Sequence, residues 1–134
     1  MNWKILEQEI ASLSNKINDK IDIIIGIIRG GLIPARLLSS TLGIKKMFCL
    51  SVEKESSERK VVTNIQADIS SKTILLVEDM LETGRSLIVA KKYLESKGAV
   101  VKTACLYTMP ISEVKPDYSL KVVDSIPKFP WEKE

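Results

Sequence analysis

The chain has 134 residues, of which 45% are hydrophobic and 28% are charged. This composition is close to that of soluble globular proteins and argues against disorder, a collagen-like repeat or a disulfide-rich scaffold. The length is typical of one domain, so we expect a single folding unit over residues 1–134 with a core large enough to have a cleft beside it.

The charge balance and the absence of histidine limit the partners and the catalytic groups that the chain can have. Twenty Lys and Arg against seventeen Asp and Glu give a formal charge of +3, and the basic residues are spread along the chain. Nucleic-acid binding usually needs a clustered basic face, so we predict no nucleic-acid partner. The sequence has no histidine, which excludes imidazole catalysis and His-ligated metals. Any acid–base catalysis would depend on carboxylates, Lys, Tyr or water.

The start of the chain and the two cysteines bear on the compartment. Charged residues occur within residues 1–7, where a signal peptide would have its apolar stretch, and no uncharged run approaches the roughly eighteen residues of a membrane helix. Cys49 and Cys105 stand in apolar, strand-like runs, where reduced and buried thiols are common. We therefore expect a soluble, cytoplasmic protein with no membrane partner.

The first half of the chain predicts a helix, a strand and a second helix. Apolar residues at steps of three and four predict a first helix over about residues 2–18, packed as a lid over a sheet edge. Residues 22–28 form a nearly continuous β-branched run, typical of a strand buried on both faces of a parallel sheet. The strand ends at Arg29-Gly30-Gly31, after which Pro34 begins a second helix that Gly43 closes.

The middle of the chain predicts a strand and then a solvated loop. Residues 47–52 have a strand pattern, whereas residues 53–60 contain no apolar side chain and predict a loop. Val61, Val62 and Ile65 predict a returning strand.

Two further strands and a helix complete the alternating pattern. Residues 73–77 predict a second fully buried strand, and a helix follows from about Thr83 to its stop at Gly98. Residues 100–107 predict a third buried strand, after which the pattern breaks. Strands that alternate with helices predict an α/β fold with a mainly parallel central sheet flanked by helices and right-handed crossovers.

Ligands of an open parallel sheet bind at the carboxyl ends of its strands, and three strand ends here carry unusual residues. Arg29-Gly30-Gly31 follows the first strand, Glu78-Asp79 the second, and the segment after Tyr107 the third. The Gly30-Gly31 pair lets backbone amides approach a ligand closely, although an ordinary strand-to-helix turn has the same appearance.

The most informative stretch is residues 74–86, where a buried strand, two carboxylates and a Thr-Gly turn precede a helix. The amides and hydroxyls of Thr83 to Ser86 and the helix dipole together form an anion cradle suited to a phosphate monoester. Glu78 and Asp79 can hold sugar hydroxyls or, through water, a hard cation. A capped helix after a polar turn is the alternative explanation.

This stretch resembles the phosphoribosyl pyrophosphate motif of type I phosphoribosyltransferases. Arg29-Gly30-Gly31 is similar to the pyrophosphate-contacting loop of that family, and residues 53–60 are similar in place to its flexible catalytic loop. Residues 116–118 and Phe129-Pro130-Trp131-Glu132 resemble the short bacterial and archaeal 6-oxopurine members, which act on xanthine, guanine or hypoxanthine. The resemblance implies the type I fold, with a core over about residues 20–107 and a small C-terminal hood over about 108–134 that adjoins the N-terminal helix.

The resemblance also implies an activity. In this family a nucleobase nitrogen displaces pyrophosphate from C1 of the ribose, with Mg2+ on the pyrophosphate. The expected substrates are thus phosphoribosyl pyrophosphate and a purine base, the expected reaction is nucleotide salvage, and Mg2+ is the expected cofactor. The catalytic residues that the resemblance implies are Glu82, Asp79 and Glu78, the last two also holding metal indirectly; the substrate-binding residues are Arg29, Gly30, Thr83, Gly84, Arg85, Ser86, Met109, Ile126 and Trp131.

Three of these residues depart from the family pattern. Relatives carry an aspartate at the place of Glu82, where it is thought to accept or relay a proton at the base. Met109 replaces a lysine that donates to the purine O6, and methionine cannot donate that bond. Ile126 replaces a tryptophan that stacks on the base, so stacking on the acceptor is reduced.

Two further functions therefore stay open beside purine transfer. The chain can be a phosphoribosyltransferase for a different acceptor, since the phosphoribosyl half of the motif set is intact while the hood has changed. It can also be a non-catalytic regulator that binds phosphoribosyl pyrophosphate or a nucleotide. For each function, family resemblance leads us to expect a homo-oligomer.

Overall fold

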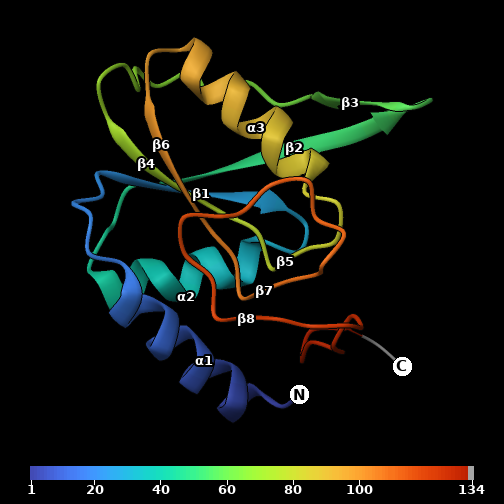
Figure 1. The fold of residues 1–134 in the computed structure, drawn as a ribbon. Helices are drawn as coiled ribbons and strands as arrows, with labels where there is room; N and C mark the ends of the chain where they lie inside the picture. The colour runs from blue at the N-terminus through green and yellow to red at the C-terminus, as the bar shows by residue number, and fades with distance from the viewer. Residues whose placement is uncertain (133–134) are drawn as a thin grey trace.

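A computed structural model describes residues 1–132. Helices cover both faces of a central sheet (Figure 1). The last two residues of the expected hood, 133–134, lie outside this described part. In chain order the elements are α1 Trp3–Lys16, β1 Ile23–Ile28, α2 Leu32–Leu42, β2 Met47–Glu55, β3 Glu58–Val61, β4 Thr73–Val77, β5 Met80–Leu81, α3 Arg85–Ser96, β6 Val100–Ala104, β7 Tyr107–Thr108 and β8 Lys121–Val122.

The central sheet has five strands in the order β3-β2-β1-β4-β6. Its β2-β1-β4-β6 part is parallel, and only β3 runs antiparallel to its neighbour. The predicted α/β fold with a mainly parallel sheet is therefore confirmed. Because β1 and β4 are neighbours in register, with Gly26 opposite Val77, the loops that follow these two strands leave the sheet side by side.

The alternation of side chains along the strands divides the core into two apolar layers. Ile23, Ile25 and Ile27 of β1 pack with the buried residues of α3 on one face of the sheet. Ile24 packs on the other face with α2, and α1 packs outside it. The first helix thus packs mainly on α2 rather than over a sheet edge, because its apolar stripe meets the outer apolar side of that helix (Figure 1).

The segment after β6 supplies β7 and β8, which join β5 from the loop after β4 in a second, smaller sheet in the order β5-β7-β8. The N-terminal helix is tied to this part of the chain. The Tyr107 hydroxyl donates to the Glu9 carboxylate at 2.8 Å, and the Trp3 and Trp131 rings have centroids 6.4 Å apart. The chain leaves the central sheet after Ala104. The expected third strand over residues 100–107 is consequently split in two.

The loop expected over residues 53–60 is instead a β-hairpin. β2 continues to Glu55, Ser56 and Ser57 form the turn, and β3 returns from Glu58 to Val61. Glu53 stands opposite Lys60, a pair of opposite charges that favours this register, whereas Lys54 opposite Arg59 and Glu55 opposite Glu58 are pairs of like charge. An absence of apolar residues indicated exposure correctly but did not exclude a two-stranded ribbon.

Two helix starts also differ from the sequence-based prediction. α2 begins at Leu32, before Pro34, because proline is tolerated in the first turn of a helix. α3 begins at Arg85, since Gly84 adopts a φ of 80° in front of it. The predicted strand at residues 73–77 is confirmed without change. None of the helices in residues 1–132 combines the length and apolar character needed to span a bilayer.

The turn after β1 presses against the end of β4 at Gly31. A Cβ on Gly31 would meet the backbone carbonyl oxygen of Val77 well inside van der Waals contact and the carbonyl oxygen of Ile27 at 2.8 Å. Neither atom can move without disturbing the sheet. The spacing of the two loops therefore depends on the absence of a side chain at this position.

We predict that Gly31→Ala lowers the free energy of unfolding by about 3 kcal/mol or more, because the added methyl group overlaps rigid backbone. Gly43→Ala is the matched control: it has φ 70° but nothing within 4 Å of its Cβ position, so it should cost only about 1 kcal/mol. Urea denaturation measures both values. Equal losses in the two variants would contradict the close approach at Gly31.

Candidate active site

The loops after β1 and β4 meet at the carboxyl edge of the sheet. A Cβ on Gly30 would collide with the carboxylate of Asp79, so the glycine backbone and this acidic side chain are in direct contact. The Ile28–Arg29 peptide bond at this turn is cis. The Asp79 carboxylate also accepts a hydrogen bond from the Met80 backbone N–H at 2.7 Å. Two strand-end motifs that are far apart in the sequence therefore form one surface.

The cradle, which we define as residues 82–86, joins β5 to the start of α3. Gly84 turns the chain with φ 80°, and the Arg85 N–H donates to the Thr83 hydroxyl at 3.3 Å. The first N–H groups of a helix have no acceptor within the helix, and they lie at the positive end of its dipole. The cradle therefore includes a helix N-terminus, the kind of position at which anions bind.

The acidic pair sits in an environment that disfavours two negative charges. Burial, together with the neighbouring Asp79 carboxylate, raises the pKa of Glu78 to about 8. Burial also raises the pKa of Asp79, and the Glu132 carboxylate contributes in the same direction. A ligand that brings positive charge or hydroxyl donors to this pair would relieve the repulsion.

Two cavities are lined by the expected site residues other than Met109 and Ile126. One, of about 270 Å³, is lined by Glu78, by Arg59 of β3 and by all five residues of the cradle. The other, of about 640 Å³, is lined by Arg29, Gly30, Leu32, Ile33, Asp79, Trp131 and Glu132, and we call it the strand-end cavity. The adjacent residues Glu78 and Asp79 therefore face different cavities on either side of one strand end.

The three expected hood residues do not lie together. Trp131 lines the strand-end cavity, and its ring stacks on that of Phe129 with centroids 4.7 Å apart and planes 3° apart. Ile126 is 57% exposed and lines neither cavity. Met109 lines neither cavity, and its N–H donates to the Leu81 carbonyl at 2.9 Å. Of the three, only Trp131 reaches the site in this structure.

Sequence reasoning left two charged cavity residues without a role. Arg59 belongs to the charged run over residues 53–60, where no position could be distinguished until the hairpin brought β3 beside the cradle. Glu132 follows Trp131 and lines the strand-end cavity with Asp79. The Phe-Pro-Trp-Glu stretch that contains it was the available signal, since a carboxylate beside a buried aromatic segment is unusual.

The donor set fits a magnesium ion that arrives with a substrate rather than a resident one. Within residues 1–132, no three carboxylate or thiol side chains cluster closely enough to form a metal cage. Mg2+ is usually held by one or two carboxylates together with substrate phosphates and water. Glu78, in the cavity of the cradle, and Asp79, in the strand-end cavity, supply hard oxygen donors of this kind.

The comparisons with known proteins agree with this geometry. The family model described as phosphoribosyl transferase domain matches residues 2–134. The chain belongs to the phosphoribosyl transferase family. A purine phosphoribosyltransferase from Pyrococcus horikoshii is 33% identical, with a TM-score of 0.92 over 100% of this chain and 93% of that one. This structural match supports the phosphoribosyltransferase fold over the whole chain.

Curated members of the family match shorter parts. A hypoxanthine-guanine phosphoribosyltransferase from Lactococcus lactis is 42% identical over 49% of this chain and 38% of its own length. An orotate phosphoribosyltransferase from Pyrobaculum islandicum is 31% identical over 66% of this chain and 45% of its own length. These matches span less than half of either relative, and the two proteins are named for different acceptors.

The raised pKa of Glu78 predicts a specific pH dependence of stability. Between its ordinary value of 4.5 and the folded value of about 8, the folded protein binds more protons than the unfolded chain, so stability falls as pH rises through this window. Glu78→Gln removes that titration. We expect it to raise the free energy of unfolding by about 2 kcal/mol at pH 8 and to change it little at pH 4.

Urea denaturation at pH 4 and pH 8 measures this difference. Glu95→Gln, at an exposed position on α3, is the control and should change stability by less than about 0.5 kcal/mol at either pH. Parallel pH profiles for wild type and Glu78→Gln would show that Glu78 is not a buried, repelled carboxyl.

Proposed function

We propose that this protein transfers the 5-phosphoribosyl group from phosphoribosyl pyrophosphate to a purine base and releases pyrophosphate. The observation that carries this proposal is the contact between Gly30 and the carboxylate of Asp79, whose neighbour Glu78 lines the cavity of the cradle. It forms one continuous edge from an amide-rich turn, through two carboxylates, to a helix N-terminus. A ligand with a pyrophosphate, a ribose and a 5′-phosphate in that order matches this sequence of groups.

Each part of the edge has a role in the proposed reaction. The N–H groups and hydroxyls of the cradle would hold the 5′-phosphate. Glu78 and Asp79 would accept hydrogen bonds from the ribose hydroxyls, and Arg29 with Gly30 would contact the pyrophosphate. Glu82, the first residue of the cradle, is the carboxylate that would exchange a proton with the base. Positioning and electrostatic stabilisation would therefore supply most of the rate enhancement.

Magnesium and the hairpin complete the proposed site. When bound, Mg2+ neutralises charge on the departing pyrophosphate, and Glu78 and Asp79 are the residues that would hold it through water. The β2–β3 hairpin brings Arg59 to the cavity of the cradle. Its position there would help to exclude water from an oxocarbenium-like ribose, which is readily hydrolysed.

The purine acceptor rests on two supports. The solved structure that matches this chain over its full length is titled a purine phosphoribosyltransferase. In addition, Trp131 presents an aromatic ring to the strand-end cavity, and a flat, apolar wall of this kind suits a heterocyclic base.

A different acceptor is the second candidate, and particular residues favour it. Met109 and Ile126 stand where purine-specific contacts are expected, yet neither lines a site cavity. Relatives named orotate phosphoribosyltransferase match 65% and 66% of this chain. Loss of the contact to the purine O6 would remove one means by which the site distinguishes oxo from amino groups.

The test is pyrophosphate release from phosphoribosyl pyrophosphate with Mg2+, measured across a panel of free bases with the products identified by mass. We expect release that depends on hypoxanthine, guanine or xanthine, and no release in Asp79→Asn, which loses a charged acceptor at the sugar. Release with orotate alone would replace the purine acceptor by a pyrimidine. Silence with every base, in protein that still binds phosphoribosyl pyrophosphate, would favour a regulator over an enzyme.

A further inference from the structure

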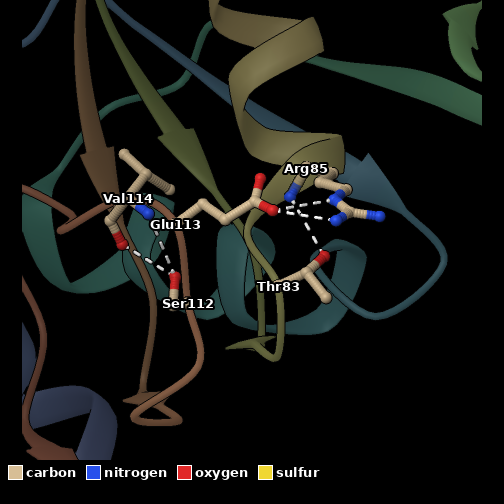
Figure 2. A network of polar contacts seen from close by, with 5 residues as sticks. All are labelled: Thr83, Arg85, Ser112, Glu113 and Val114. Atoms are coloured by element: carbon tan, nitrogen blue, oxygen red, sulfur yellow. Dashed lines mark hydrogen bonds and ion pairs between the residues drawn. The ribbon is translucent and has the colours of Figure 1, made fainter.

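An ion pair joins the cradle to the segment that follows β7 (Figure 2). The Nε and Nη2 atoms of Arg85 donate to one oxygen of Glu113 at 3.1 and 2.9 Å. The Glu113 N–H donates to the Thr83 carbonyl at 2.8 Å. We call these three hydrogen bonds the clasp. It links residues 28 positions apart in the sequence at the edge of the proposed phosphate site.

The clasp and a main-chain hydrogen bond beside it occupy donors that an anion in the cradle would use. The Arg85 guanidinium is directed to Glu113, and the Arg85 N–H donates to the Thr83 hydroxyl (Figure 2). A main-chain donor and a side-chain donor of Arg85 are thus both satisfied by acceptors of the protein itself. An incoming phosphate must compete with Glu113 for the Nε and Nη2 edge of the guanidinium, the edge suited to a bidentate contact.

The backbone on the hood side of the clasp is fixed. A Cβ on Gly84 would meet Val114 Cγ1 at 2.5 Å and Ser112 Oγ at 2.9 Å, so residues 112–114 lie directly against the cradle. The Ser112 hydroxyl donates to the Val114 carbonyl at 2.8 Å, which holds this segment in its turn. The Glu113 carboxylate is therefore anchored close to the cradle by the backbone that carries it.

The side chains of the clasp, in contrast, are free to exchange partners. The Arg85 and Glu113 side chains are 53% and 48% exposed. An ion pair this exposed is screened by water and is readily exchanged for a stronger one. A doubly charged phosphate held by helix-terminal N–H groups offers Arg85 a stronger partner than a single carboxylate.

Glu113 also faces a second cation. Its pKa is held below the ordinary value by the hydrogen bond from Arg85 and by the charges of Arg85 and Arg59. Arg59, Arg85 and Glu113 line one further cavity, of about 210 Å³, next to the cradle. The carboxylate thus lies beside guanidinium groups from both β3 and α3, an environment that also suits an anionic ligand.

We propose that Glu113 is a positioning residue that acts through Arg85: its carboxylate holds the guanidinium while the cradle is empty and gives it up when the 5′-phosphate of the donor binds. This inference rests on the proposed function, because it takes the cradle to be the phosphate site. Glu113 then lowers the affinity for the donor by competing for Arg85. The main-chain hydrogen bond from Glu113 to Thr83 does not involve the carboxylate, so the hood segment stays against the cradle in both states.

Calorimetric titration with phosphoribosyl pyrophosphate and Mg2+ at fixed ionic strength tests the proposal. We expect Glu113→Gln to lower Kd about two- to fivefold, since that range corresponds to the free energy of an exposed ion pair. Glu7→Gln, an exposed position on α1, removes the same charge elsewhere and should leave Kd unchanged. In the background of Arg85→Gln, adding Glu113→Gln should have no further effect on Kd.

The sign of the change separates this role from a structural one, because a loosened cradle would bind the donor more weakly. An unchanged or raised Kd in Glu113→Gln, or a gain that persists without Arg85, would overturn the proposal. If Glu113→Gln binds the donor more tightly but no base is converted, the clasp stands and the proposed transfer to a purine fails. If wild type does not bind the donor, both fail.

Discussion

The contact between the turn after β1 and the end of β4 is the constraint on which the site depends. Gly31 lies against the Val77 carbonyl and Gly30 against the Asp79 carboxylate, distances that only residues without a Cβ allow. Because β1 and β4 are parallel neighbours, the two loops leave the sheet at the same edge. The buried sheet thus holds an amide-rich turn and an acidic pair at one fixed spacing, and this spacing is what matches an extended, multiply charged ligand.

The site has an acidic half, formed by Glu78 and Asp79, and a basic half at the cradle. This difference in charge indicates what kind of ligand binds there. Burial raises the pKa values of Glu78 and Asp79, and like-charge repulsion from Asp79 on Glu78 and from Glu132 on Asp79 acts in the same direction, so this half gains from added positive charge. The cradle half has the opposite need, because it combines a helix N-terminus with Arg59 and Arg85. A sugar phosphate accompanied by a divalent cation satisfies both halves together, whereas a free anion or a free metal would satisfy only one.

The sequence was sufficient for the parts of the fold that depend on local pattern. Continuous β-branched runs identified β1 and β4 as buried parallel strands, and the motif over residues 74–86 located the cradle, because those properties are encoded by adjacent residues. The hairpin over residues 53–61 was missed because a run of charged and polar residues lacks the apolar pattern by which a strand is predicted. Arg59 and Glu132 could not be placed because their neighbours in the site come from elements that are distant in the sequence. The partnership of Arg85 with Glu113 likewise depends on tertiary structure.

A crystal structure of the protein with phosphoribosyl pyrophosphate and Mg2+ tests the central claim most directly. The account predicts the 5′-phosphate within hydrogen-bond distance of the N–H groups of residues 83–86, the ribose beside Glu78 and Asp79, and the pyrophosphate against Arg29 and Gly30. A donor bound elsewhere, for example in the cavity of about 570 Å³ lined by Arg36, Ser39, Ser40 and Lys45, would contradict it.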